Sequence, residues 1–171
     1  KEKDCSKTEL PASMFSFNKL EAACPDCKGL GIVTTADPDK FITDPEKPVT
    51  DGAMNGTKPG KFFGDPFGQY VNTLKKVGEL KGINFSIPFI KLTNEAKEIA
   101  LNGTGEATYN VEWRFKRGNR TGIHKLKTKW KGFISYLNED YEIKREGSRG
   151  EAFNEIMKDI ECPVCHGKRL R

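Results

Sequence analysis

The sequence predicts an α+β fold: a small antiparallel sheet with a basic hairpin, packed by several helices and closed at its base by a site of four cysteines. Two observations predict it, a cysteine motif that recurs at opposite ends of the chain and two alternating apolar and polar segments joined by a turn. A chain of 171 residues can bury one ordinary core, and 36% hydrophobic with 31% charged residues is typical of a globular protein.

The cysteine motif is Cys-x-x-Cys followed by glycine, and it occurs at Cys24 with Cys27 and at Cys162 with Cys165. Each pair can wrap one edge of a zinc ion, and the glycines let the backbone turn so that its N–H groups face the thiolates. We expect the four thiolates to form one structural Zn²⁺ site. The 134 residues between Cys27 and Cys162 would then be a domain looped out of a zinc clasp.

We call each copy of the cysteine motif a knuckle. One site shared by both knuckles predicts three parts: a host segment with the first knuckle (1–31), an inserted domain (32–160), and the second knuckle with the return to the host (161–171). No run of about 18 apolar residues occurs, and the first residues lack the apolar core of a signal peptide. Paired cysteines suit metal binding in a reducing compartment, so we expect a cytoplasmic protein without a membrane partner. Cys5 is either half of another site or a free thiol.

Positive charge is concentrated in residues 112–131, where eight Lys or Arg face one Glu, a local net charge of +7 in a chain of +5. Alternation over 109–116 and again over 125–131 predicts a hairpin with an aromatic underside and a basic top. The predicted DNA-binding residues are Arg114, Lys116, Arg117, Arg120, Lys125, Lys127, Lys129 and Lys131. Like charges this dense repel one another unless a polyanion neutralises them, which favours a phosphate-binding surface over a merely solvated sheet face.

Four helices are expected around the hairpin. The first begins at Asp65 and Pro66 and ends at Gly82, and the second runs from Thr93 to Leu101. The others cover Phe133 to Tyr141 and, from a capping box, Ser148 to Ile160. Frequent Pro, Gly and Asp predict a mobile loop with at most short strands over 37–64.

Three aromatic residues of the hairpin lie on its apolar side by parity, namely Trp113, His124 and Trp130. Either tryptophan could stack on an unpaired base, although we expect both to pack in the core. His124 is expected to be a packing or surface residue rather than a catalyst.

Four segments of the chain resemble, in order and spacing, the first half of the UvrA family: Met14 to Asn18, Ala23 to Gly31, Asp37 to Asp39, and Cys162 to Arg171. UvrA proteins are damage-sensing ABC-type ATPases of bacterial nucleotide excision repair. The resemblance implies that the inserted domain is the family's insertion domain, and that the two cysteine pairs ligate one structural zinc at its root.

The resemblance also implies partners: double-stranded DNA carrying damage, a UvrA-like homodimer as the parent protein, and a UvrB-like partner bound through other domains. Neither a Gly-x-x-x-x-Gly-Lys-Ser/Thr loop nor a Leu-Ser-Gly-Gly signature occurs in the 171 residues. We therefore expect no enzymatic activity from this stretch, with ATP bound elsewhere in an ABC-type parent. The alternative is a protein-interaction or regulatory module of a UvrA-like ABC protein, such as a paralogue associated with drug resistance.

Two other interpretations of the cysteines are weaker. Cys162 to His166 also match the Cys-x-x-Cys-His of c-type haem attachment, but that interpretation leaves Cys24 and Cys27 unexplained. A redox pair is possible in isolation, yet two pairs bracketing one domain favour a closed structural site.

Overall fold

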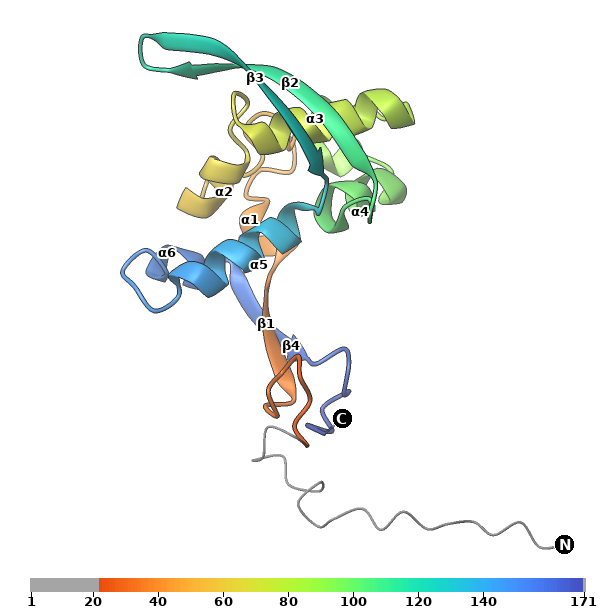
Figure 1. Ribbon diagram of the computed structural model, residues 1–171, viewed down its shortest axis with the longest axis vertical. Helices are drawn as coiled ribbons and strands as arrows, with labels where there is room; N and C mark the ends of the chain where they lie inside the picture. The colour runs from red at the N-terminus through yellow and green to blue at the C-terminus, as the bar shows by residue number, and fades with distance from the viewer. Residues whose placement is uncertain (1–21, 171) are drawn as a thin grey trace, which may run out of the picture. The chain divides into compact units, whose positions relative to one another are not determined.

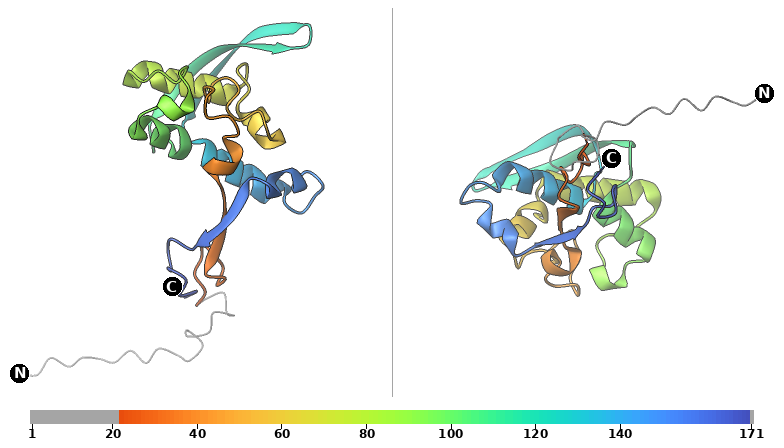
Figure 2. Two further views of the ribbon diagram at one scale, coloured as in Figure 1. Left: turned by 180° about the vertical axis from the view of Figure 1, so that it is seen from behind. Right: turned by 90° about the horizontal axis from the view of Figure 1, so that it is seen from below.

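The computed structural model describes residues 22–170, apart from the side chain of Arg117. This part of the chain divides into two compact units, one made of residues 22–34 with 159–170 and the other of residues 35–158. Figures 1 and 2 show the path of the chain through both. Within the described part, no helix is long and apolar enough to cross a membrane.

The predicted basic hairpin is present as β2 (Thr108–Arg117) and β3 (Arg120–Lys129), which pair antiparallel around a two-residue turn. Directly opposed residues share a face of the ribbon. One face therefore carries the predicted basic residues Arg114, Lys116, Lys125, Lys127 and Lys129. The other face carries Tyr109, Val111, Trp113, Phe115 and His124. The separation of a basic face from an aromatic face is confirmed.

Three of the predicted helices are present, as α3 (Gln69–Lys81), α4 (Asn94–Asn102) and α5 (Phe133–Lys144). The Thr93 hydroxyl caps α4 by accepting the N–H of Ala96, as the sequence indicates. The start of α3 was predicted too early. Asp65 closes a local turn in which its carboxylate accepts the N–H of Phe67 at 2.9 Å, and this turn precedes the helix.

The predicted helix over Ser148 to Ile160 is wrong. Only α6 (Glu151–Asn154) is helical there, and the chain continues as β4 (Met157–Glu161), paired with β1 (Ile32–Ala36). Backbone hydrogen bonds at the two ends of this pair, from Asp37 to Ile156 and from Cys162 to Gly31, show that the strands run antiparallel. Pairing with a distant strand outweighs the helical spacing of the apolar residues.

The segment 37–64 was predicted to be a loop, and this is wrong in two places, α1 (Pro38–Phe41) and α2 (Lys58–Phe63). Thr57 caps α2 by accepting the N–H of Gly60 at 3.1 Å. The segment also supplies buried core residues, among them Phe41, Val49, Met54 and Phe63.

The core of residues 35–158 is centred on Trp130, which is fully buried. Its indole N–H donates to the carbonyl of Ile99 at 2.7 Å, and its ring meets that of Phe133 edge to face. A short 3₁₀ helix, η2 (Phe89–Lys91), and the helices α3, α4 and α5 contribute apolar side chains around it. The core thereby holds the base of the hairpin by its aromatic face and leaves the basic face toward solvent.

We predict that Asp37→Asn destabilises residues 35–158 more at neutral pH than in acid. Asp37 accepts the N–H of Asp39 and pairs with Lys158 at 3.0 Å. Burial alone raises its pKa, but Lys158, this N–H and Lys40 together hold the pKa below its ordinary value. The stabilisation is therefore present above the unfolded pKa of about 3.9 and is lost as pH falls through the folded pKa.

Thermal unfolding followed by circular dichroism checks this. At neutral pH the variant should lose about 1 kcal/mol of stability, because asparagine still accepts the N–H of Asp39 but loses the ion pair with Lys158. The difference should shrink in acid as the pH falls through the folded pKa, because the carboxyl of Asp37 is then neutral as well. The exposed Asp51→Asn is the control, and an equal loss at neutral and acid pH would contradict the assignment.

Candidate functional site

The structure brings all four predicted cysteines together in one buried cluster whose sulfur atoms lie within 4.8 Å of one another. Sγ of Cys24 is 3.8 Å from that of Cys162, and Sγ of Cys27 is 3.6 Å from that of Cys165. A tetrahedral zinc with bonds of about 2.3 Å requires sulfur separations of about 3.8 Å. A disulfide would need about 2.05 Å. The geometry therefore fits a four-coordinate metal ion.

The two knuckles share one backbone conformation. Positive φ angles occur at the first, second and fourth residues after each pair, namely Lys28, Gly29 and Gly31 in one and His166, Gly167 and Arg169 in the other. The N–H of Gly31 donates to Sγ of Cys27 at 3.2 Å, and the N–H of Arg169 donates to Sγ of Cys165 at 3.4 Å. Such donors stabilise thiolate ligands and fix their orientation.

The knuckles are also bonded to each other in a reciprocal way. The N–H of Cys24 donates to the carbonyl of Arg169 at 3.0 Å, and the N–H of Cys162 donates to the carbonyl of Gly31 at 2.9 Å. Each of Gly31 and Arg169 thus donates to a sulfur of its own knuckle and accepts from the other. The clasp has approximate two-fold symmetry, although only one of the two equivalent positions is glycine.

The thiols do not titrate alike. Burial alone raises the pKa of Cys27, but the N–H groups of Gly31 and Gly29 and the neighbouring thiols lower it from 9.0 to about 7. Burial raises the pKa of Cys165 to about 11. Of these two thiols, Cys27 is deprotonated at the lower pH, because it accepts N–H donors from both Gly31 and Gly29.

The basic hairpin is less free of acids than the sequence suggested. Two of its lysines form ion pairs with glutamates, namely Lys125 with Glu112 at 3.1 Å and Lys129 with Glu106, and Lys131, which lies beyond the end of β3, pairs with Glu139 at 2.8 Å. The Lys129 pair, together with its hydrogen bond, lowers the pKa of Glu106. Two of these glutamates come from outside residues 112–131, so counting charges within that stretch could not reveal them.

The other predicted cations of the hairpin are free of described acidic partners. Arg114, Lys116, Arg120 and Lys127 make no ion pair with any residue from 22 to 170. Arg114, Lys116 and Lys127 share the basic face with Lys125 and Lys129, whereas Arg120 lies beside the turn. The side chain of Arg117, and Cys5 as a whole, lie outside the described residues.

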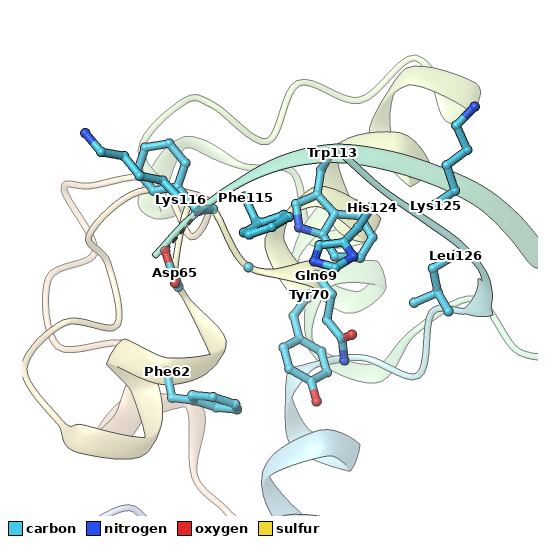
Figure 3. Close-up of a pocket in the computed structure, with 12 residues that line it drawn as sticks. Phe62, Asp65, Gln69, Tyr70, Trp113, Phe115, Lys116, His124, Lys125 and Leu126 are labelled. Carbon is cyan, nitrogen blue, oxygen red and sulfur yellow. Dashed lines mark hydrogen bonds between the residues drawn. The ribbon is translucent and has the colours of Figure 1, made fainter. Parts of the chain in front are cut away.

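The aromatic side of the hairpin lines a cavity of about 570 Å³ against the chain that joins α2 to α3 (Figure 3). His124 lies beside two rings of β2, with centroids 5.2 Å from Trp113 and 4.3 Å from Phe115. Trp130 packs in the core as expected, but Trp113 is only half-buried and opens into this cavity. The sequence did not predict this cavity. Its second wall comes from residues 62–70, which the sequence predicts as the end of a loop and the start of a helix, and no local pattern places them against the hairpin.

Comparison with known proteins gives consistent relatives. A family model described as the UvrA DNA-binding domain matches residues 37–153. UvrABC system protein A of Staphylococcus epidermidis is 35% identical over 162 residues, and that of Methanothermobacter thermautotrophicus is 32% identical over 163 residues. Each alignment covers 95% of this chain but 16% of the relative, so the chain spans only a small part of their length.

Among solved structures, UvrA2 from Deinococcus radiodurans matches with a TM-score of 0.58 and 22% identity. The match covers 93% of this chain and 19% of that one. At this identity the likeness shows a shared fold.

We predict that the purified chain carries about one zinc ion per molecule and that Cys162→Ser loses it. The four cysteines form a cluster of their own, separate from the apolar core around Trp130. Metal removal should therefore leave residues 35–158 folded but less stable, because their two ends are no longer held together. Elemental analysis with circular dichroism checks both statements, and Cys5→Ser, which should keep its zinc, is the control. Loss of zinc in that control would require a different ligand set.

We predict that Gly31→Ala weakens metal binding by about 10- to 100-fold. Gly31 has φ of +80°, and an added Cβ would lie 3.1 Å from Cγ of Arg169 and 3.2 Å from the carbonyl oxygen of Gly167. The strain moves the N–H that supports Cys27. Competition with a chromogenic chelator measures the affinity, with Leu30→Ala at an exposed neighbouring position as the control. Equal affinity in both variants would count against this role of Gly31.

Proposed function

This chain belongs to the UvrA DNA-binding domain family, and from that premise we propose that its basic hairpin contacts the phosphates of double-stranded DNA. One observation supports this most directly. Arg114, Lys116, Lys125, Lys127 and Lys129 project from a single face of β2 and β3, on the side opposite the residues that enter the core. A row of cations along a two-stranded ribbon can follow a phosphate backbone.

The proposed binding is electrostatic. Unpaired Arg114, Lys116 and Lys127 can displace counterions from phosphates without first losing a protein partner. The pairs of Lys125 and Lys129 are solvent-exposed, so each contributes little to stability and can be exchanged for a phosphate. Contacts of this kind carry no base information, as a domain that meets damage in any sequence requires.

The proposed metal is one structural Zn²⁺ held by Cys24, Cys27, Cys162 and Cys165. Four buried thiols at tetrahedral spacing, with backbone donors to two of the sulfurs, suit zinc better than a hard cation such as Mg²⁺. A closed set of four protein ligands leaves no position for substrate, so the metal's role is to hold the two knuckles together.

For the parent protein, we propose a cytoplasmic UvrA-like ABC ATPase of nucleotide excision repair. Residues 32–160 would be its insertion domain, with 1–31 and 161–171 belonging to the host domain. ATP, the second subunit of a homodimer and a UvrB-like partner would bind to other parts of that protein, and the DNA would be damaged duplex.

A second candidate is a protein-interaction or regulatory module of a UvrA-like paralogue. The ion pairs of Lys125 and Lys129 favour it, because they neutralise part of the basic face. The salt dependence of DNA binding separates the two candidates, since phosphate contacts require a steep dependence.

We predict that the combined variant Lys125→Glu, Lys127→Glu and Lys129→Glu weakens duplex binding equally for unrelated sequences. The slope of log affinity against log salt concentration should shrink by roughly 0.9 for each phosphate contact removed. Fluorescence anisotropy with a labelled duplex at several salt concentrations measures both quantities.

The matched control reverses three exposed lysines outside the hairpin, namely Lys75, Lys81 and Lys91. It makes the same change in net charge and should have a much smaller effect. Equal losses in the two variants would show that net charge, and not the hairpin face, determines binding. If the hairpin variant is folded and zinc-loaded but its affinity for DNA is unchanged, the protein-interaction module becomes the better-supported function.

A further inference from the structure

The aromatic groove, as we name the cavity of about 570 Å³ in Figure 3, lies between the hairpin and the chain from α2 to α3. Its aromatic lining consists of Phe62, Phe67, Tyr70, Trp113, Phe115 and His124. A neighbouring cavity of about 350 Å³ shares Phe67, Phe115 and Lys116 and continues toward the hairpin turn. Volumes of this size are typical of small-ligand sites.

Several of these rings are not required by the core. Phe62 is 58% exposed and Phe67 is 52% exposed, and neither ring belongs to the core around Trp130. Phe115 is half-buried and lies across the backbone of its opposed residue Gly122, where an added Cβ would be 2.5 Å from the ring. The absence of a side chain at Gly122 thus sets the position of the Phe115 ring in the groove.

Polar and charged groups accompany the rings. Gln69 lines the groove, and its side chain makes no hydrogen bond with any described residue, so its amide can both donate and accept. Lys116 lines both cavities, Arg114 lines the second, and neither has an ion pair within residues 22–170. Exposed rings bordered by free cations are the combination that binds unpaired nucleotides, with bases on the rings and phosphates on the cations.

We propose that the aromatic groove receives an unpaired nucleobase from distorted DNA. The base stacks on Phe67 and Phe115, and its flanking phosphates lie on Lys116 and Arg114. This proposal rests on the proposed function and adds that the domain prefers DNA with unpaired bases. Every base has a π face, so the groove selects unpaired bases of any identity. The basic face then binds duplex of any kind, and the groove favours duplex whose pairing is broken.

The test compares an intact duplex with the same duplex carrying a short central bulge of unpaired thymines, using the zinc-loaded full chain. The wild type should bind the bulged DNA at least about fivefold more tightly, since stacking contributes roughly 1 kcal/mol or more per base. Phe67→Leu combined with Phe115→Leu should bring this ratio close to one while leaving affinity for the intact duplex unchanged. Ile143→Ala, at an exposed apolar position on α5, is the control and should keep the wild-type ratio.

Gly122→Ala is a second variant, and it removes no aromatic side chain. It displaces the Phe115 ring and should lower the ratio as well. Reversal of Lys127 and Lys129, which line neither cavity, should weaken binding of both DNAs with the ratio retained. A ratio that stays at the wild-type value in the double leucine variant overturns the proposal, as does an equal loss for both DNAs.

Failure of the groove and failure of the proposed function are distinguishable. If the wild type binds intact duplex and bulged DNA with equal affinity, the groove proposal alone is wrong. The exposed rings would then bind something else, such as a protein partner. Wild type that binds neither DNA overturns the proposed function and the groove with it.

Trp113 provides an independent readout, because it lines the groove whereas Trp130 is fully buried. Bulged DNA should quench tryptophan emission more than intact duplex does at saturation. The excess quenching should be absent in Trp113→Phe. Equal quenching by the two DNAs in the wild type would contradict stacking in the groove.

Discussion

The reciprocal bonding of the two cysteine knuckles is the constraint on which the rest of the chain depends. It brings together sulfur atoms of residues 138 positions apart in sequence, and each knuckle completes the backbone hydrogen bonds of the other. Everything between Cys27 and Cys162 is therefore a closed loop. A cross-link across so long a loop removes much conformational entropy from the unfolded chain. The same closure explains why residues 157–161 form a strand, because they must pair with β1 on the way back to the second knuckle.

The hairpin divides its two faces between stability and binding. Near its base, Tyr109 and Val111 enter the core around Trp130, and this contact determines which face is turned away. The alternate residues of β2 and β3 then present their cations to solvent. A two-stranded ribbon isolated in water is marginally stable, so the packed aromatic face is what allows the basic face to remain ordered.

The aromatic face is not uniform along its length. Trp113 still packs against the core, whereas Phe115 lies two residues closer to the turn, where the ribbon continues beyond the helices (Figure 1). Phe115 lines an open cavity with Phe62 and Phe67 instead of entering a closed apolar layer. One end of the aromatic face packs in the core and the other lines the groove, so the groove can bind a flat ring while the core stays folded. In the proposed function this groove lies on the same ribbon as the phosphate contacts.

The sequence by itself determined the features that depend on short-range spacing. Two cysteines separated by two residues, strict alternation on either side of a tight turn, and the cap residues Thr93 and Gly82 each act within a few residues, so they predicted the metal ligands, the hairpin and three helices. Tertiary structure decided what depends on distant partners. The residues after α6 became a strand because β1 was available. Glu106 and Glu139 paired with Lys129 and Lys131 from outside residues 112–131, and Phe62 and Phe67 came to line one cavity with Phe115. No local pattern encodes these pairings, because their free energy comes from groups that only the folded chain brings together.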